Sequence, residues 1–322
     1  MRAKRPLGAR VFFATSDGAE LQEAKWSMVQ LQAQTLIEIH PSVAFEALST
    51  VIVTDDVWET VGELERQVGR EVEAARNGAR HMPVFSVDIG EEFCLVVRNS
   101  VADLLLLPSH AESRRAMEVL RIELARIKVL SDLRRRIGGD PRLVAMDEMR
   151  SAWFGRSRDT WHSYASARLA YAEGLSTDDA IAHFVKSLEE ESQALLFAIE
   201  QFKRNRDVLT LASDLQDAVG RLSNSMACAM GQITASGKAL DDWWPGLTTH
   251  IEEEGLGTYW RPLATTLESF WEKQEGWTVA NDLVELGRLF LAFLASLGLT
   301  FEANASGGYT VSFVPSRPQR LQ

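Results

Sequence analysis

The spacing of apolar residues changes at Ser109, and this change limits the fold classes open to the chain. Before Ser109, stretches with helical spacing alternate with short runs rich in β-branched residues, a pattern typical of helices mixed with strands. From Ser109 onward almost every stretch has helical spacing. Ser109 and Glu112 also stand at capping-box spacing, which indicates the start of a long helix. The sequence therefore predicts an α+β protein that is predominantly helical.

The same patterns place the individual elements. Residues 18–39 are predicted to form a helix whose apolar stripe holds Leu21, Met28, Leu31, Thr35 and Ile39. Further helices are predicted at 57–75, 109–136, 176–202, 206–230, 258–273 and 278–297, strands at 48–53, 84–89 and 93–97, and a hairpin at 299–314. We expect three regions: an α+β region at 1–175, a helical region at 176–298, and a hairpin with a tail at 299–322.

Charge and cysteine content limit the functions that the protein can have and indicate its cellular compartment. The 322 residues carry a formal charge of −11, which argues against broad affinity for nucleic acid because phosphate binding needs a concentrated positive field. Cys94 and Cys228 are the only cysteines, and two isolated thiols suggest a reducing compartment. The apolar tract at 289–299 is shorter than the roughly 20 residues that span a bilayer. We expect a cytoplasmic protein without a membrane partner.

Motifs that would identify a common enzyme class are incomplete. The glycines at 231 and 237 are followed by Lys238, but five residues separate them and Ala239 follows, whereas a phosphate-binding loop needs four residues and a Ser or Thr. No two of the six histidines stand three or four residues apart, so no helix offers two imidazoles to one metal. The sequence predicts no intact catalytic site and no cofactor.

Two strings and the order of the elements resemble another kind of site. The order from residue 48 is strand, helix, two short strands, long helix and second helix, and the string VIVTDDVWETVGEL occupies 51–64. The long helix contains IELAR at 122–126, and WHSYASAR follows at 161–168. Over roughly residues 48 to 172 the chain resembles zincin-like metallopeptidases of the gluzincin type. Their long helix carries H-E-x-x-H, whose histidines hold zinc and whose glutamate is the general base.

The resemblance implies a zincin-like fold that has lost its metal site and is catalytically inactive. Glu123 keeps the position of the base, Ile122 and Arg126 replace the two histidines, and Ser163 replaces the third ligand. Arg126 would place a permanent positive charge where the metal would sit, so we expect its guanidinium to pair with Glu123. The resemblance also places the small mixed sheet against the helix at 109–136.

The sequence is compatible with three functions. The first is a non-catalytic zincin-like protein that acts as a binding or scaffold subunit of a protein complex. The second is a divergent metal-dependent hydrolase, in which His110, Glu112 and His162 hold a relocated metal and Glu123 is the base. The third is a helical interaction protein unrelated to zincins.

Tryptophans are concentrated late in the chain. Five of the nine lie at 243, 244, 260, 271 and 277. Trp260 and Trp271 can share one helix face with apolar neighbours, which favours core packing. Trp243 and Trp244 are adjacent and cannot both face one core, so one of them is a candidate contact for another protein.

Overall fold

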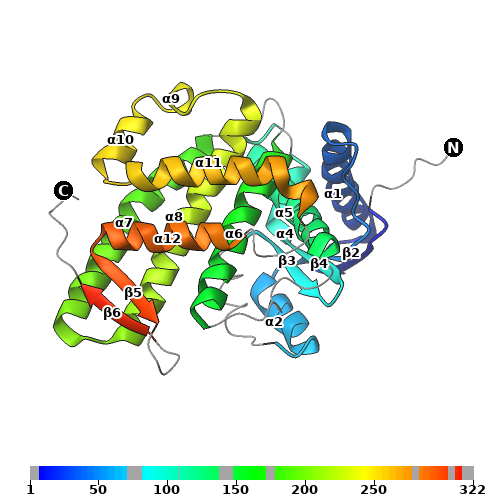
Figure 1. Cartoon of the computed structure of the whole chain (residues 1–322). Coiled ribbons are helices and arrows are strands. Elements are labelled where there is room, and N and C mark those ends of the chain that lie inside the picture. Colours follow the sequence, from blue (N-terminus) through cyan, green and yellow to red (C-terminus); the bar gives the residue numbers. More distant parts are fainter. Residues whose placement is uncertain are drawn as a thin grey trace. The chain divides into compact units, whose positions relative to one another are not determined.

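A computed structural model of the chain describes residues 7–70, 82–107, 109–137, 148–171, 178–277, 283–303 and 309–313. The chain forms two compact units that interleave in sequence. The first unit takes Met1–Asp132 and Leu169–Ser176, and the second takes Leu133–Arg168 and Thr177–Gln322. Helices predominate, a four-stranded sheet lies in the first unit, and a two-stranded sheet lies in the second (Figure 1). The predicted fold class, α+β and mostly helical, is therefore confirmed.

The sheet of the first unit is mixed. Its strands are β1 (Arg10–Ala14), β2 (Leu48–Thr54), β3 (Val84–Ile89) and β4 (Glu92–Arg98), in the order β1-β2-β4-β3. β2 pairs in parallel with β1 and with β4, and β3 pairs antiparallel with β4. The carboxyl ends of three strands therefore meet at one edge of the sheet.

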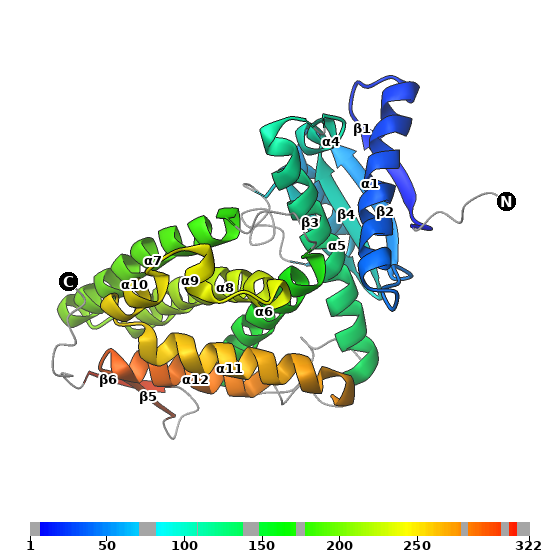
Figure 2. The ribbon, with the colours of Figure 1, turned by 90° about the horizontal axis from the view of Figure 1, so that it is seen from above.

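Helices cover both faces of this sheet. One face is covered by α1 (Ala19–Ile39), α4 (Asn99–Leu105) and α5 (Ala111–Ile137), which share one apolar core with the strands (Figure 2). The other face is covered by α2 (Val57–Gln67), whose buried apolar residues pack on β3 and β4. Asp56 caps α2 by accepting a hydrogen bond from the backbone N–H of Glu59 at 2.9 Å. The expected sheet beside the long helix is present.

The second unit is built mainly from helices. They are α6 (Glu148–Ala170), α7 (Asp178–Asn205), α8 (Val208–Ser236), α9 (Leu240–Trp243), α10 (Leu247–Glu253), α11 (Gly257–Lys273) and α12 (Val284–Ser296), with a short 3₁₀ helix η2 at Gln274–Gly276. β5 (Leu299–Ala303) and β6 (Tyr309–Phe313) form the predicted hairpin by antiparallel pairing. Its turn lies outside the described residues.

Close packing joins the helices of this unit. At Gly231 of α8 the chain passes so near α6 that an added Cβ would lie 2.3 Å from the carbonyl oxygen of Tyr164. Arg221 of α8 donates two hydrogen bonds to the carboxylate of Glu191 on α7, at 2.6 and 2.8 Å. Trp161 of α6 lies at the centre of an aromatic cluster with ring centroids 5.2 to 6.5 Å apart.

The structure corrects several local predictions. β1 and α4 were not predicted, and α2 ends at Gln67, before a turn in which Gly69 has a φ of +69°, rather than at residue 75. Residues 71–75 and 278–282 of the predicted helices lie outside the described part of the chain. The predicted face of α1 is wrong: Leu21, Leu31 and Ile39 are exposed. The buried side chains of α1 are Lys25, Trp26, Val29, Gln32, Ala33 and Leu36.

Candidate functional site

The site predicted from the degenerate metal-binding string lies where α5 packs on strand β3. The side chain of Ser86, on β3, points to the same face as Leu95, its cross-strand partner in the core shared with α5. Its hydroxyl donates a hydrogen bond to Oε2 of Glu123 at 3.0 Å. Nη1 of Arg126 donates to Oε1 of the same carboxylate at 3.1 Å. The predicted ion pair between Glu123 and Arg126 is therefore confirmed.

The burial of Glu123 makes the hydrogen bonds to its carboxylate important for the stability of the fold. Glu123 is only 3% exposed, so its carboxylate has little access to water and needs partners inside the protein. Each of its two oxygens receives a hydrogen bond, one from a strand and one from the next turn of its own helix. The hydrogen bond from Ser86 to the Glu123 carboxylate thus links α5 to the sheet, and it is charge-assisted. Ser86 was not predicted as part of the site, because a single serine in a strand gives no signal of a partner 37 residues away.

The other two predicted positions lie in different surroundings. Ile122 is half-buried on α5, next to Glu123. Ser163 belongs to α6 in the second unit, and its hydroxyl donates to the backbone oxygen of Asp159 one turn earlier, at 2.9 Å. The structure therefore brings Glu123 and Arg126 into contact, and it places Ser163 in the other unit.

These residues do not fit a zinc ion. Zinc takes nitrogen, sulfur or carboxylate ligands, and Ile122 offers no lone pair. Arg126 donates hydrogen bonds and cannot be deprotonated in a protein. The carboxylate of Glu123 is engaged on both oxygens. No chemistry that requires a metal can be derived from this set of side chains.

The alternative metal site was expected to use His110, Glu112 and His162. His110 and Glu112 are exposed at the start of α5, where the backbone N–H of Glu112 donates to Nδ1 of His110 at 3.2 Å. His162 is buried in α6, which is part of the second unit. Within the described residues there is no group of three or more His, Cys, Asp or Glu arranged to hold a metal ion.

A buried lysine near the carboxyl ends of the parallel strands was missed by sequence reasoning. The ammonium of Lys25, on α1, lies 2.7 Å from Asp17, 2.6 Å from Asn99 and 2.7 Å from Asp103. Its side chain is fully buried, and these three contacts use the three donors of the ammonium group. The group therefore joins α1, the segment after β1, and α4. The available signal was Lys25 itself, which shares a helical stripe with Val29 and Leu36.

The charges in this group shift each other's pKa. Burial acts to lower the pKa of Lys25, but its hydrogen bonds to Asp103 and Asp17 outweigh burial and raise the pKa above its ordinary value. The hydrogen bond from Lys25 is the main cause that lowers the pKa of Asp17, and the hydroxyl of Thr15 assists it. Both shifts favour the charged forms, so we assign this group a structural role.

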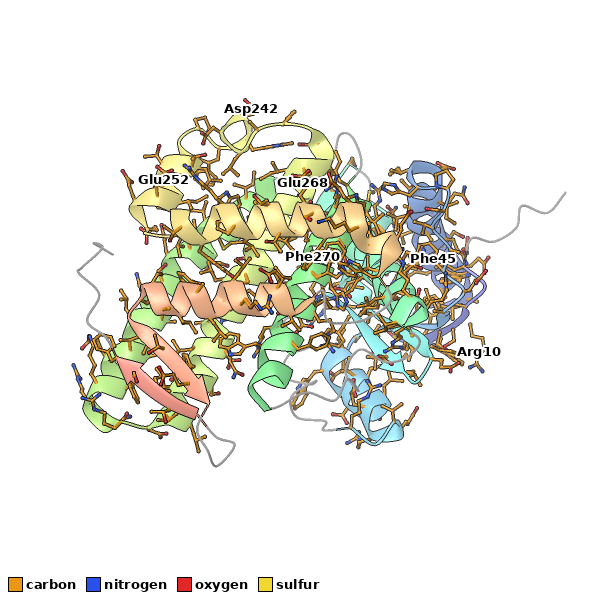
Figure 3. All side chains as sticks on the ribbon, viewed as in Figure 1. Arg10, Phe45, Asp242, Glu252, Glu268 and Phe270 are labelled. Carbon is orange, nitrogen blue, oxygen red and sulfur yellow. The ribbon has the colours of Figure 1, made fainter. Side chains whose placement is uncertain are left out.

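Some of the tryptophans late in the chain pack against other aromatic rings, and others are partly or largely exposed. Trp260 stacks on Phe184 with ring centroids 5.0 Å apart, and Trp271 packs against Trp161 at 6.5 Å. Trp243 is half-buried: its indole N–H donates to Ser236, and the ammonium of Lys238 lies 4.3 Å from its ring. Trp244 is 42% exposed. It lies in the α9–α10 segment, which also carries Asp242 and Glu252 (Figure 3).

Comparisons with known proteins assign no family to this chain. No protein-family model matches it, and searches of curated proteins and of solved structures find no match. The likeness to zincins therefore stays a prediction. Among the helices that the structure describes, none combines the length and the apolar character needed to cross a bilayer.

Proposed function

We propose that this chain is a non-catalytic, zincin-like protein that acts in the cytoplasm as a binding or scaffold subunit of a protein complex. The observation that carries the proposal is that the carboxylate of Glu123 is buried and hydrogen-bonded on both oxygens. A general base must reach the proton that it removes, directly or through one water. Glu123 is instead buried and held by Ser86 and Arg126.

In this proposal the hydrogen-bonded carboxylate of Glu123 takes over the mechanical role of the lost metal. Zinc in a zincin ties its helix to neighbouring elements through several ligands. Here the carboxylate of Glu123 ties α5 to β3, and the guanidinium of Arg126 compensates its charge. A helix fixed in this way can support a binding surface without turnover. We propose Trp244 as a contact for the protein partner, since an exposed indole combines a large apolar face with a polar edge.

The test restores the metal ligands. The triple variant Ile122→His, Arg126→His and Ser163→Glu recreates the gluzincin ligand set if the fold is zincin-like. We expect the variant to bind one equivalent of zinc and to melt at a higher temperature with zinc than without it, since ligand binding stabilises the native state. The control variant Ile122→Asn, Arg126→Gln and Ser163→Glu changes the same positions without adding an imidazole, and we expect it to bind no zinc.

Two results would contradict the proposal. A triple variant that folds, as judged by circular dichroism, but gains no more zinc than its control would show that the three positions do not converge as in a zincin. Stoichiometric zinc in the purified wild-type chain, together with zinc-dependent cleavage of a mixed peptide substrate, would show that the protein is an enzyme.

A further inference from the structure

A cavity of about 370 Å³ lies in the first unit, apart from Glu123 and its partners. Its walls come from the end of β4, from α4 and from the first turns of α5. This volume is within the roughly 300–1,000 Å³ typical of sites for small ligands. Strand β4 runs parallel to β2, and open sheets with parallel strands commonly bind ligands beyond the carboxyl ends of these strands.

Two of the four polar side chains that line the cavity are cationic. Arg98 is the last residue of β4, and Arg115 lies on the second turn of α5. Against these two guanidinium groups the lining contains one carboxylate, Glu112, and one hydroxyl side chain, Ser100. The formal charge of the lining is therefore +2 − 1 = +1, in a chain whose net charge is −11. A local positive field of this kind favours an anion.

The backbone of Arg98 is hydrogen-bonded to another residue of the lining. The backbone N–H of Arg98 donates to the carbonyl oxygen of Pro83 at 2.9 Å, and Pro83 also lines the cavity. Arg98 directly precedes α4 with an extended backbone, at φ −64° and ψ 135°. A guanidinium has five N–H donors in a planar fork, so it can contact a protein group and still bind a carboxylate.

The remaining lining is apolar. Val101 and Leu104 contribute from α4, and Ala116 and Val119 contribute from α5. These side chains offer no hydrogen-bonding groups, so they suit an alkyl or aryl body rather than a sugar or a nucleotide base. A single charged group on a compact apolar body matches both parts of the cavity.

We propose that this cavity binds a small organic anion, a monocarboxylate with a compact apolar body, whose carboxylate pairs with Arg98 and Arg115. The planar guanidinium matches a carboxylate with two parallel hydrogen bonds. Glu112 in the lining disfavours a doubly charged phosphate through like-charge repulsion. The assignment goes beyond the proposed scaffold function and does not depend on it.

The test uses phenylacetate as the probe and 2-phenylethanol as its uncharged analogue, titrated into the full chain by isothermal titration calorimetry. We expect saturable binding of phenylacetate in the millimolar range or tighter, and binding of 2-phenylethanol at least about tenfold weaker. Arg115→Gln should weaken phenylacetate binding by at least about fivefold. Arg114→Gln is the matched control, because Arg114 is exposed and adjacent in sequence but does not line the cavity.

A second variant removes space and leaves the charges unchanged. Val119→Trp fills the cavity from a half-buried position on α5, and we expect it to abolish binding while circular dichroism shows the native helix content. The proposal would be overturned if phenylacetate does not bind at a concentration of about 20 mM, which is 20-fold above a dissociation constant of about 1 mM. Equal losses in the Arg114 and Arg115 variants, or equal affinity for the uncharged analogue, would overturn it as well. Tighter binding of phenyl phosphate than of phenylacetate would refute the assignment to a monocarboxylate.

Discussion

Replacing Gly231 by alanine tests how closely α8 packs on α6. The added Cβ would lie 2.3 Å from the carbonyl oxygen of Tyr164, 3.0 Å from the backbone nitrogen of Arg168 and 3.1 Å from Cβ of Ala167. Cβ atoms in proteins essentially never come within 3.0 Å of a heavy atom from a distant residue, and the two nearest atoms here belong to a helical backbone that cannot rotate away. The two helices must therefore separate.

The expected change in the free energy of unfolding is the difference between two opposing effects. Overpacking of a core costs about 1–3 kcal/mol and sometimes more, and the contact with a rigid backbone places this substitution at or above the upper end. Alanine gains roughly 1 kcal/mol over glycine in a helix interior. We therefore expect Gly231→Ala to lower the free energy of unfolding by about 2–3 kcal/mol and, for a unit of this size, to lower the Tm by about 4–12 °C.

The matched control is Gly155→Ala on α6, where an added Cβ meets nothing within 4 Å. That substitution should be neutral or stabilise the protein by up to about 1 kcal/mol, since only helix propensity changes. Urea denaturation followed by tryptophan fluorescence measures both variants. Trp26 and Trp58 belong to the first unit and the other seven of the nine tryptophans to the second, so the signal reports mainly on the second unit. A Gly231→Ala variant as stable as Gly155→Ala would refute the reasoning.

Three further predictions concern other buried groups. Lys25→Met should destabilise the protein most at neutral pH, because the bond to Lys25 lowers the pKa of Asp17 and so stabilises the folded state above pH 3.8, the ordinary value of that pKa. This stabilisation is lost as the pH falls through the folded-state pKa of Asp17. Denaturation at pH 7 and at pH 3 should therefore show a smaller difference between variant and wild type in acid. Trp277→Ala should cost about 3–5 kcal/mol because its ring is buried, whereas Trp244→Ala should change the free energy of unfolding by less than about 0.5 kcal/mol; equal losses in chemical denaturation would contradict the division between packing and exposure. In a variant that keeps Cys94 as its only cysteine, the thiol should not react with a thiol reagent at pH 8 until the protein is denatured, because burial raises its pKa to about 12; rapid reaction in the folded state would show that β4 is accessible.

Local patterns predicted most of the elements, because helical and strand spacing are properties of short segments. The strands at 84–89 and 93–97 and the helix at 109–136 agree with β3, β4 and α5 to within two residues. The strand β1 was missed because its place in the sheet depends on pairing with β2, which is far away in the sequence.

The wrong face of α1 has a physical cause. Lys25 and Gln32 stand on the buried side, where polar residues are unusual, so the apolar pattern favoured the opposite side. Gln32 is buried because it accepts a hydrogen bond from Arg121, which is 89 residues away, at 2.8 Å. No local pattern contains that partner. The same limit applies to Lys25, whose bond to Asn99 spans 74 residues.

The candidate site was predictable only in part. The pair of Glu123 and Arg126 follows from their spacing of three residues on one helix. The contact of Glu123 with Ser86 depends on which strand α5 packs against, and this is a property of the sheet order. The cavity near Arg98 depends on tertiary packing, because its walls come from the end of β4 and from the helices α4 and α5.

The interleaving of the two units has a consequence for synthesis on the ribosome. The chain leaves the first unit at Leu133 and returns to it at Leu169–Ser176, after most of α6 has been made for the second unit. Domains usually fold as they emerge, amino-terminal part first. Here the amino-terminal unit lacks its last segment until α6 has emerged, and most of α6 then waits for partners from α8, such as Gly231, that are translated later. We therefore expect the packing face of α6 to stay exposed on the nascent chain until α8 has emerged, and a chaperone could protect it during that interval.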